Sequence, residues 1–141
     1  MAASTDVRSI EEMFTEFGNL SSAPAGIDRW LSHFSNDVVW EALEDAPDAG
    51  TYRGHAGIRG YAEDWLGTVD DPHFEIRELS EVNGCVIGDC HFAARIKGTD
   101  NELTLDFWQV WRFEDRKIRR VKEFREREDA IAFAEAGAPD P

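Results

Sequence analysis

A change of hydrophobic period near His73 constrains the fold of this 141-residue chain more than any other feature. Beyond it, apolar and polar residues alternate as they do in half-buried strands. The alternation predicts four strands, at residues 74–82, 85–97, 102–114 and 117–126. Asn83-Gly84 is typical of a two-residue hairpin turn, and residues 98–101 and 115–116 provide the next two turns. This half of the chain is therefore predicted to be an antiparallel meander.

The half before His73 has a helical period instead. It predicts helices at 7–17, 27–34 and 55–66, a short strand at 38–42 and an acidic loop at 44–50. A last short helix is predicted at 129–136. Helices and strands that segregate in this way indicate the α+β class: a bent antiparallel sheet of five to six strands wrapped around three N-terminal helices. No linker or internal repeat interrupts the pattern, so residues 1–141 are predicted to form a single domain.

Composition argues against some partners. The formal net charge is −14, which disfavours nucleic acid or an anionic membrane as the principal partner. Basic residues cluster between Arg116 and Arg127, but carboxylates interrupt them, so we interpret the cluster as a solvated strand. No apolar run approaches the ~18 residues that span a bilayer, and no signal peptide is recognised. Cys85 and Cys90 on one strand would lie roughly 16 Å apart, too far for a disulfide, so a cytoplasmic location is expected.

Several segments resemble the SnoaL-like branch of the nuclear-transport-factor-2-like superfamily, over roughly residues 7–133. They are Asp37–Glu41 (DVVWE), Pro47–Gly54 (PDAGTYRG), Trp108–Phe113 (WQVWRF) and Lys122–Ala130 (KEFREREDA). The resemblance implies a cone-shaped fold with a ligand cavity at its open end. Similar proteins include ketosteroid isomerases, polyketide cyclases, dehydratases, epoxide hydrolases and binding domains without activity.

The catalytic set of ketosteroid isomerases is not retained. By resemblance, the general-base Asp corresponds to Ala42, the oxyanion-hole Tyr to Phe17, and the protonated Asp donor to Gln109. Gln109 can still donate a hydrogen bond, but Ala42 cannot accept a proton. Ketosteroid isomerisation by that mechanism is therefore disfavoured.

Gln109 is the polar member of an alternating apolar face. The face consists of Leu103, Leu105, Phe107, Gln109, Trp111 and Phe113. A buried amide needs partners, so Gln109 either makes a structural hydrogen bond, to the backbone or to Glu123, or orients a ligand carbonyl or hydroxyl.

Two glutamates are candidate acids or bases. Glu123 on the neighbouring strand would be a desolvated acid/base if it points inward, or a partner of nearby cations if it points outward. For Glu41, strict alternation puts Trp40 and Ala42 inward and the Glu41 carboxylate outward. A bulge in this strand would exchange the two faces and turn Glu41 inward.

Asp89 and His91 share one face of a strand with Arg95, which suits an acid/base dyad or two metal ligands. The residues that look like the core side of this strand are Gly88, Cys90, Phe92 and Ala94. This places Asp89 and His91 on the opposite, convex face, so we expect a surface or interface pair. No metal or other cofactor is predicted.

The sequence thus predicts a pocket for a small, largely apolar organic molecule. Its predicted lining is Trp40, Tyr61, Trp65, Phe107, Gln109 and Trp111, and Glu123 and Gln109 are the candidate catalytic residues. The chain would be a cofactor-independent isomerase, cyclase or lyase. The alternative is a non-catalytic ligand-binding or dimerisation module whose aromatic residues fill the cone. A cavity that reaches both Gln109 and Glu123 would favour the first.

A homodimer is also predicted. Ile87, Ala93, Trp108 and Val110 fall on the sheet face away from the predicted helices, where a monomer would expose them to water. Family resemblance implies the same assembly.

Overall fold

The computed structural model describes residues 5–17, 25–44 and 49–141. Within these ranges the elements follow one another in the predicted order, with a short additional strand, β2, before the third helix. They are α1 (Thr5–Phe17), α2 (Ala25–Leu31), β1 (Phe34–Glu41), β2 (Thr51–Arg53), α3 (Gly54–Thr68), β3 (Val69–Val82), β4 (Cys85–Ile96), β5 (Glu102–Glu114), β6 (Lys117–Phe124) and α4 (Arg127–Glu135). None of the described helices is long and apolar enough to cross a membrane.

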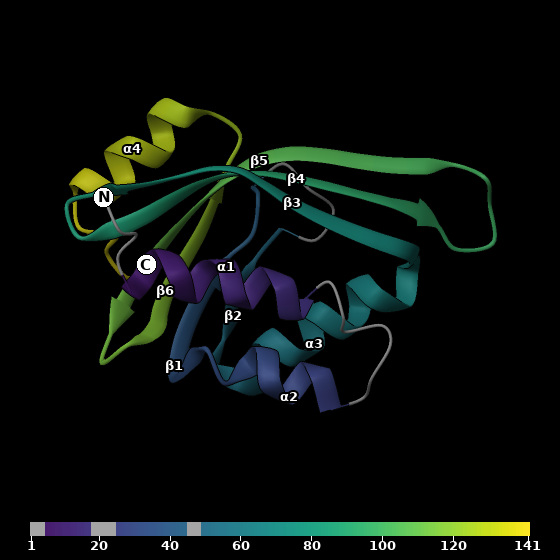
Figure 1. Cartoon of the computed structure of the whole chain (residues 1–141), viewed down its shortest axis with the longest axis horizontal. Coiled ribbons are helices and arrows are strands. Elements are labelled where there is room, and N and C mark those ends of the chain that lie inside the picture. Colours follow the sequence, from purple (N-terminus) through teal and green to yellow (C-terminus); the bar gives the residue numbers. More distant parts are fainter. Residues whose placement is uncertain (1–4, 18–24, 45–48) are drawn as a thin grey trace.

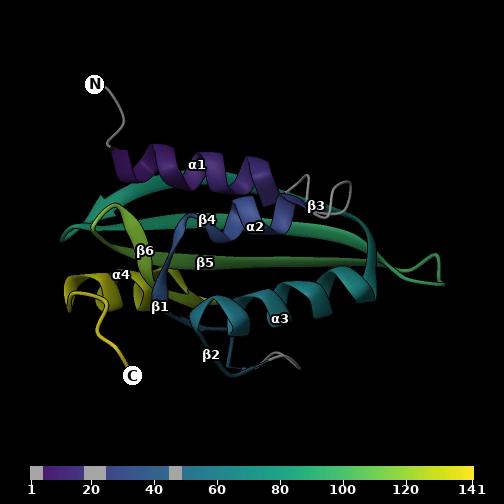
Figure 2. The ribbon, with the colours of Figure 1, turned by 90° about the horizontal axis from the view of Figure 1, so that it is seen from below.

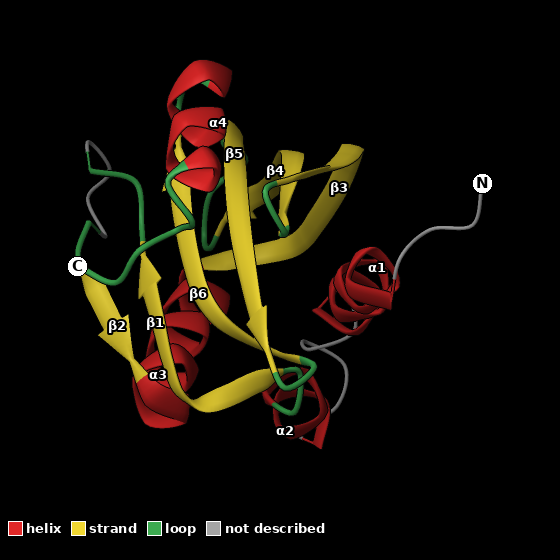
Figure 3. Ribbon diagram, turned by 90° about the vertical axis from the view of Figure 1, so that its left-hand side faces the viewer, coloured by secondary structure: helices red, strands yellow, loops and turns green. Residues whose placement is uncertain are grey.

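The described strands form one six-stranded sheet in the order β2-β1-β6-β5-β4-β3. The sheet curls strongly, as Figure 3 shows from one end. The predicted α+β class with a bent sheet is confirmed. One pair differs from the prediction, because β1 runs parallel to β6 while the other neighbouring strands are antiparallel. Alternation reveals which face a residue occupies but carries no information on the direction of a strand.

Both predicted two-residue turns have positive φ at their two central residues, as in type I′ hairpin turns. Asn83 and Gly84 have φ values of 50° and 79°, and Asp115 and Arg116 have 49° and 67°. Positive φ at both central residues matches the right-handed twist of the flanking strands. These turns set the pairing of β3 with β4 and of β5 with β6.

Helices α1, α2 and α3 lie on the concave side of the sheet, and α4 lies on the opposite side (Figure 1). Figure 2 shows α1 along the β3 side and α3 along the β1 and β2 side, with the central strands between them. The main hydrophobic core fills this concave side. The predicted second helix is shorter than expected: it ends at Leu31, and Phe34 begins β1 instead. Phe34 still packs on Trp30, with ring centroids 5.0 Å apart, so a helical spacing of apolar residues here belongs to a helix–strand corner.

The convex face is partly covered by the chain itself. Ile87 and Val110 are buried beneath α4, where they pack with Ala130 and Ala134. The prediction that these two side chains would be exposed in a monomer was wrong, because α4 folds back across β4 and β5. Ala93 and Trp108 are half-buried, and the Arg127 guanidinium lies 5.9 Å from the centre of the Trp108 ring.

Candidate functional site

The site is built on β5 and β6, which place an amide opposite a carboxylate. Counting back from the turn, Glu114 pairs with Lys117, a register that would bring Lys122 opposite Gln109. The register shifts by one residue between Arg112 and Phe113, and Gln109 then pairs directly with Glu123. The bulge also turns the Glu123 side chain to the concave face.

The Gln109 and Glu123 side chains are buried and hydrogen-bonded to each other. Gln109 is 1% exposed and Glu123 is 8% exposed. The Gln109 Nε2–H donates to Glu123 Oε2 over 2.7 Å. The second amide atom, Gln109 Oε1, is a buried acceptor that finds no hydrogen-bond partner among the described residues. The structure therefore contains the structural bond to Glu123 and leaves the amide oxygen as a second polar atom without a partner in the described residues.

A cavity opens beside this pair. It has a volume of about 60 Å³, counted as the space available to the centre of a water-sized molecule. By that measure roughly 10–15 Å³ holds one water, so several waters fit. The described lining is mainly apolar, and its aromatic members are Trp30, Trp40, Tyr61, Trp65, Phe74, Phe92 and Phe107. Gln109 and Glu123 add an amide and a carboxylate to it.

Trp40 contributes a second buried polar group. Its side chain lines the cavity and packs on Tyr61, with ring centroids 5.7 Å apart. Its indole Nε1–H is buried and has no hydrogen-bond partner in the described part of the chain. The lining thus holds one buried acceptor, on Gln109, and one buried donor, on Trp40, that the described residues leave without partners.

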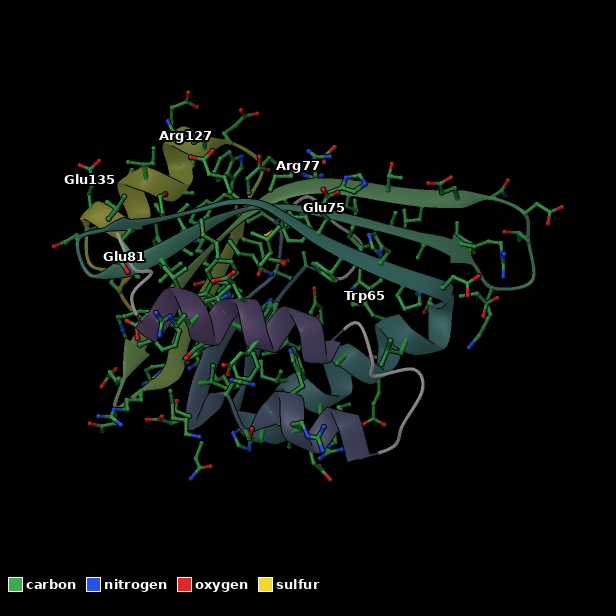
Figure 4. The ribbon with its side chains drawn as sticks, viewed as in Figure 1. Trp65, Glu75, Arg77, Glu81, Arg127 and Glu135 are labelled. Carbon is green, nitrogen blue, oxygen red and sulfur yellow. The ribbon has the colours of Figure 1, made fainter. Side chains whose placement is uncertain are left out.

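Of the residues predicted to line the pocket, the structure places Trp40, Tyr61, Trp65, Phe107 and Gln109 on the cavity wall, together with Glu123. Figure 4 shows Trp65 on α3, beneath the sheet. Trp111 is not among the lining residues. It is fully buried, and its ring occupies the space beside Gly88 that a side chain there would otherwise fill.

Glu123 also borders a groove on the other side. This groove measures about 570 Å³ and runs between β6 and α4, past Lys122, Arg125 and Asp129. Leu43 and Glu123 line both the groove and the cavity. Glu123 therefore lies between the apolar interior and a charged surface.

Glu41 lies away from the cavity, as alternation predicts. Its carboxylate pairs with Arg120, which is 1% exposed, and with Lys122 at 3.3 Å. Burial raises the pKa of Glu41, but the hydrogen bond and charge of Arg120 outweigh burial and lower it. Ala42 is buried and offers no base. The side chain of Phe17 lies outside the described residues.

The Asp89–His91 pair is replaced by a cross-strand network. His91 Nδ1 lies 2.8 Å from Asp106 Oδ1, and Arg77 lies 3.0 Å from the same carboxylate oxygen. The hydrogen bond to His91, followed by the charge of Arg77, lowers the pKa of Asp106. Figure 4 shows Arg77 on the side of the sheet opposite α1–α3. In the described residues no three or more His, Cys, Asp or Glu side chains are grouped to hold a metal ion.

Residues 6–121 match the model of the SnoaL-like domain. The chain belongs to the SnoaL-like family. The predicted resemblance is therefore confirmed. No curated protein sequence matches this SnoaL-like chain.

Solved structures share the fold of this SnoaL-like chain. A protein of unknown function from Burkholderia pseudomallei, described as NTF2-like, has a TM-score of 0.72 at 18% identity and covers 92% of this chain and 97% of its own. TerC, co-crystallised with polyporic acid, has a TM-score of 0.71 at 25% identity, covering 94% and 97%. A Catenulispora acidiphila protein with a ketosteroid isomerase-like fold, in complex with trimethylamine, has a TM-score of 0.66 at 15% identity, covering 91% and 94%.

Sequence reasoning missed part of the cavity wall of this SnoaL-like chain. Phe74 and Phe92 are cross-strand partners whose rings lie 5.0 Å apart, and both line the cavity. The alternating pattern places both residues on predicted strands, but it cannot separate cavity wall from filled core. That distinction depends on how the curved sheet and α3 meet.

Proposed function

We propose that this SnoaL-like chain binds a small, largely apolar organic molecule in the cavity beside Gln109 and Glu123. The observation that carries the proposal is the pair of buried polar groups, Gln109 Oε1 and Trp40 Nε1–H, on a mainly apolar wall. A buried donor or acceptor without a partner costs about 1–3 kcal/mol. A ligand that satisfies either group recovers that cost on binding.

The reaction that the site supports best is a cofactor-independent isomerisation, cyclisation or elimination. In it, Glu123 takes a proton from the bound molecule and returns it, and Gln109 holds a polar substituent in place. The groove past Lys122 and Asp129 gives Glu123 a route for proton exchange with solvent while the cavity is occupied. The mechanism of ketosteroid isomerases is not available to this chain, because Ala42 stands at the position of their general base and Gln109 at that of their protonated Asp.

One observation favours the alternative, a binding module without catalysis. The cavity of about 60 Å³ is smaller than the roughly 150 Å³ of an engineered apolar cavity that takes up benzene. A single-ring ligand therefore requires half-buried side chains such as Tyr61 and Trp65 to move. Under this alternative the aromatic residues mainly complete the core, and Glu123 serves to hold Gln109.

Polyporic acid is a first probe for binding, because TerC has been co-crystallised with it and is 25% identical to this chain. Simple phenols form the rest of the panel, since a hydroxyl can act as the donor that Gln109 Oε1 lacks or as the acceptor that Trp40 Nε1–H lacks. Binding is measured as the rise in melting temperature with ligand concentration and by calorimetry. A ligand at 100 times its Kd stabilises the folded chain by about 2.7 kcal/mol.

A cavity-filling variant tests the location. Ala62 lies on α3, is 2% exposed and lines the cavity, so Ala62→Leu should occupy the space and abolish binding. Ala56 lies on the same helix but is exposed, so Ala56→Leu is the matched control and should bind as the parent does. Unchanged binding by a folded Ala62→Leu protein would contradict the proposed site. If binding survives in the cavity but no compound of the panel is converted, the non-catalytic alternative is favoured.

A further inference from the structure

The carboxylate of Glu123 determines which way the Gln109 amide faces. An ionised carboxylate has no hydrogen to donate, so only the NH₂ end of an amide can bond to it. The observed bond fits this requirement, because Gln109 Nε2 is the atom that lies 2.7 Å from Glu123 Oε2. The carbonyl end, Oε1, is then left as a buried acceptor without a partner in the described structure.

We infer that Glu123 is a positioning residue that makes Gln109 an acceptor toward the ligand, so that the site selects molecules carrying a hydroxyl or N–H donor. The inference rests on the proposed function and deepens it by naming the ligand class. That class is a flat, mainly apolar molecule, such as a phenol, whose hydroxyl donates to Gln109 Oε1. An ether or ketone of the same shape presents only acceptors to Gln109, and two acceptors cannot satisfy each other.

The sheet leaves the amide little alternative. Gln109 is 1% exposed and lies in a row across three strands, between Gly88 on β4 and Glu123 on β6. Gly88 brings no side chain to this row, so Glu123 is the neighbour in the row whose side chain can bond to the amide. A different orientation of Gln109 would require Glu123 to donate or to be replaced.

The experiment compares 4-methylphenol with 4-methylanisole, which has the same ring but a methyl group in place of the hydroxyl hydrogen. Their Kd values are measured by nuclear magnetic resonance titration for the parent chain, Gln109→Leu and Glu123→Gln. Glu78→Gln, the same chemical change at an exposed position on β3, is the control. Folding of each variant is checked by chemical denaturation.

For the parent chain and the Glu78→Gln control we expect the phenol to bind about tenfold more tightly, which corresponds to one hydrogen bond. In Gln109→Leu the ratio should fall to about twofold or less, because the acceptor is gone while the space for the extra methyl is unchanged. In Glu123→Gln the ratio should also fall, because an amide at 123 can bond to either end of Gln109.

Each result decides between distinct possibilities. Equal binding of the two compounds to the parent chain would overturn the inference and leave the proposed function standing. A preference that persists in Gln109→Leu would also overturn it, because the discrimination would then arise elsewhere. If neither compound nor any other member of the panel binds, the proposed function itself fails. The parent chain alone can therefore refute the inference, even if Glu123→Gln does not fold.

Discussion

Replacing Gly88 by alanine should destabilise the fold sharply. Gly88 lies beside Gln109 in the row that ends at Glu123, and there is no space for a side chain at position 88. A Cβ atom built on Gly88 would lie 2.6 Å from Cη2 and 2.8 Å from Cζ3 of Trp111, and 3.1 Å from Cδ2 of Leu79. Real Cβ contacts are essentially never shorter than 3.0 Å. Trp111 is fully buried, so its ring can move only by displacing core neighbours.

The expected size follows from two opposing effects. Overpacking of a core costs about 1–3 kcal/mol, and a rigid indole ring places Gly88→Ala toward the upper end. Loss of glycine flexibility in the unfolded chain offsets about 0.4–1 kcal/mol of this. The net loss should be about 2 kcal/mol, measured by urea denaturation, or a melting temperature lower by about 6 °C.

Gly60→Ala is the matched control. Gly60 lies within α3, and apart from its chain neighbours and the adjacent helix backbone no described atom comes within 4 Å of a Cβ built there. Alanine should therefore stabilise the chain by about 0.5–1 kcal/mol through helix propensity. If Gly88→Ala is neutral or stabilising to the same degree as Gly60→Ala, the proposed packing of Trp111 across Gly88 is wrong.

Three further predictions concern the rest of the molecule. Burial raises the pKa of the Cys90 thiol well above 9.0, so above pH 9.0 the unfolded chain loses this proton while the folded chain keeps it. The free energy of unfolding should therefore fall by up to about 1.4 kcal/mol for each pH unit above 9.0. Cys90→Ala should flatten that decline in denaturation measured between neutral and alkaline pH. Because the pKa of Glu41 is lowered in the folded chain, its carboxylate contributes stability above pH 4.5 that is lost as the pH falls through the folded pKa. Glu41→Gln leaves Arg120 buried without its carboxylate, so it should lower the free energy of unfolding by about 3 kcal/mol near neutral pH. The same variant should lose less stability in acid than the parent chain. A homodimer through the open part of the convex face, with Ala93 and Trp108, remains a prediction; light scattering should show a dimer that Trp108→Ala weakens, and a monomer at micromolar concentration would count against it.

The sequence was most informative where alternation was uninterrupted. The predicted bounds of β5 agree with the structure, and those of β4 and β6 differ by one or two residues at one end. β3 begins at Val69, earlier than expected. The prediction missed this start because the strand is irregular there: Asp71 has a φ of 52°, and the register with β4 shifts between Asp70 and His73. A bulge of this kind breaks the period of two, so alternation detects only the part of the strand that follows it.

The same physics limited prediction of the site. Gln109 was recognisable because it is polar on an apolar face, but the orientation of Glu123 depended on a one-residue register shift near Arg112. No local pattern of residues in β5 or β6 predicts that register shift. Trp111 lies on the predicted face but packs across Gly88 instead of lining the cavity, which only the packing of neighbouring strands determines.

The most direct test of the account is a titration of the tryptophan indole N–H resonances with 4-methylphenol, because the chain has five tryptophans on both sides of the sheet. Trp40 and Trp65 line the cavity, whereas Trp108 lies on the convex face beside Arg127. We expect the resonances of Trp40 and Trp65 to shift in a saturable manner and that of Trp108 to stay unchanged. A saturable shift of Trp108, with Trp40 and Trp65 unaffected, would show that ligands bind the convex face and would contradict the central claim.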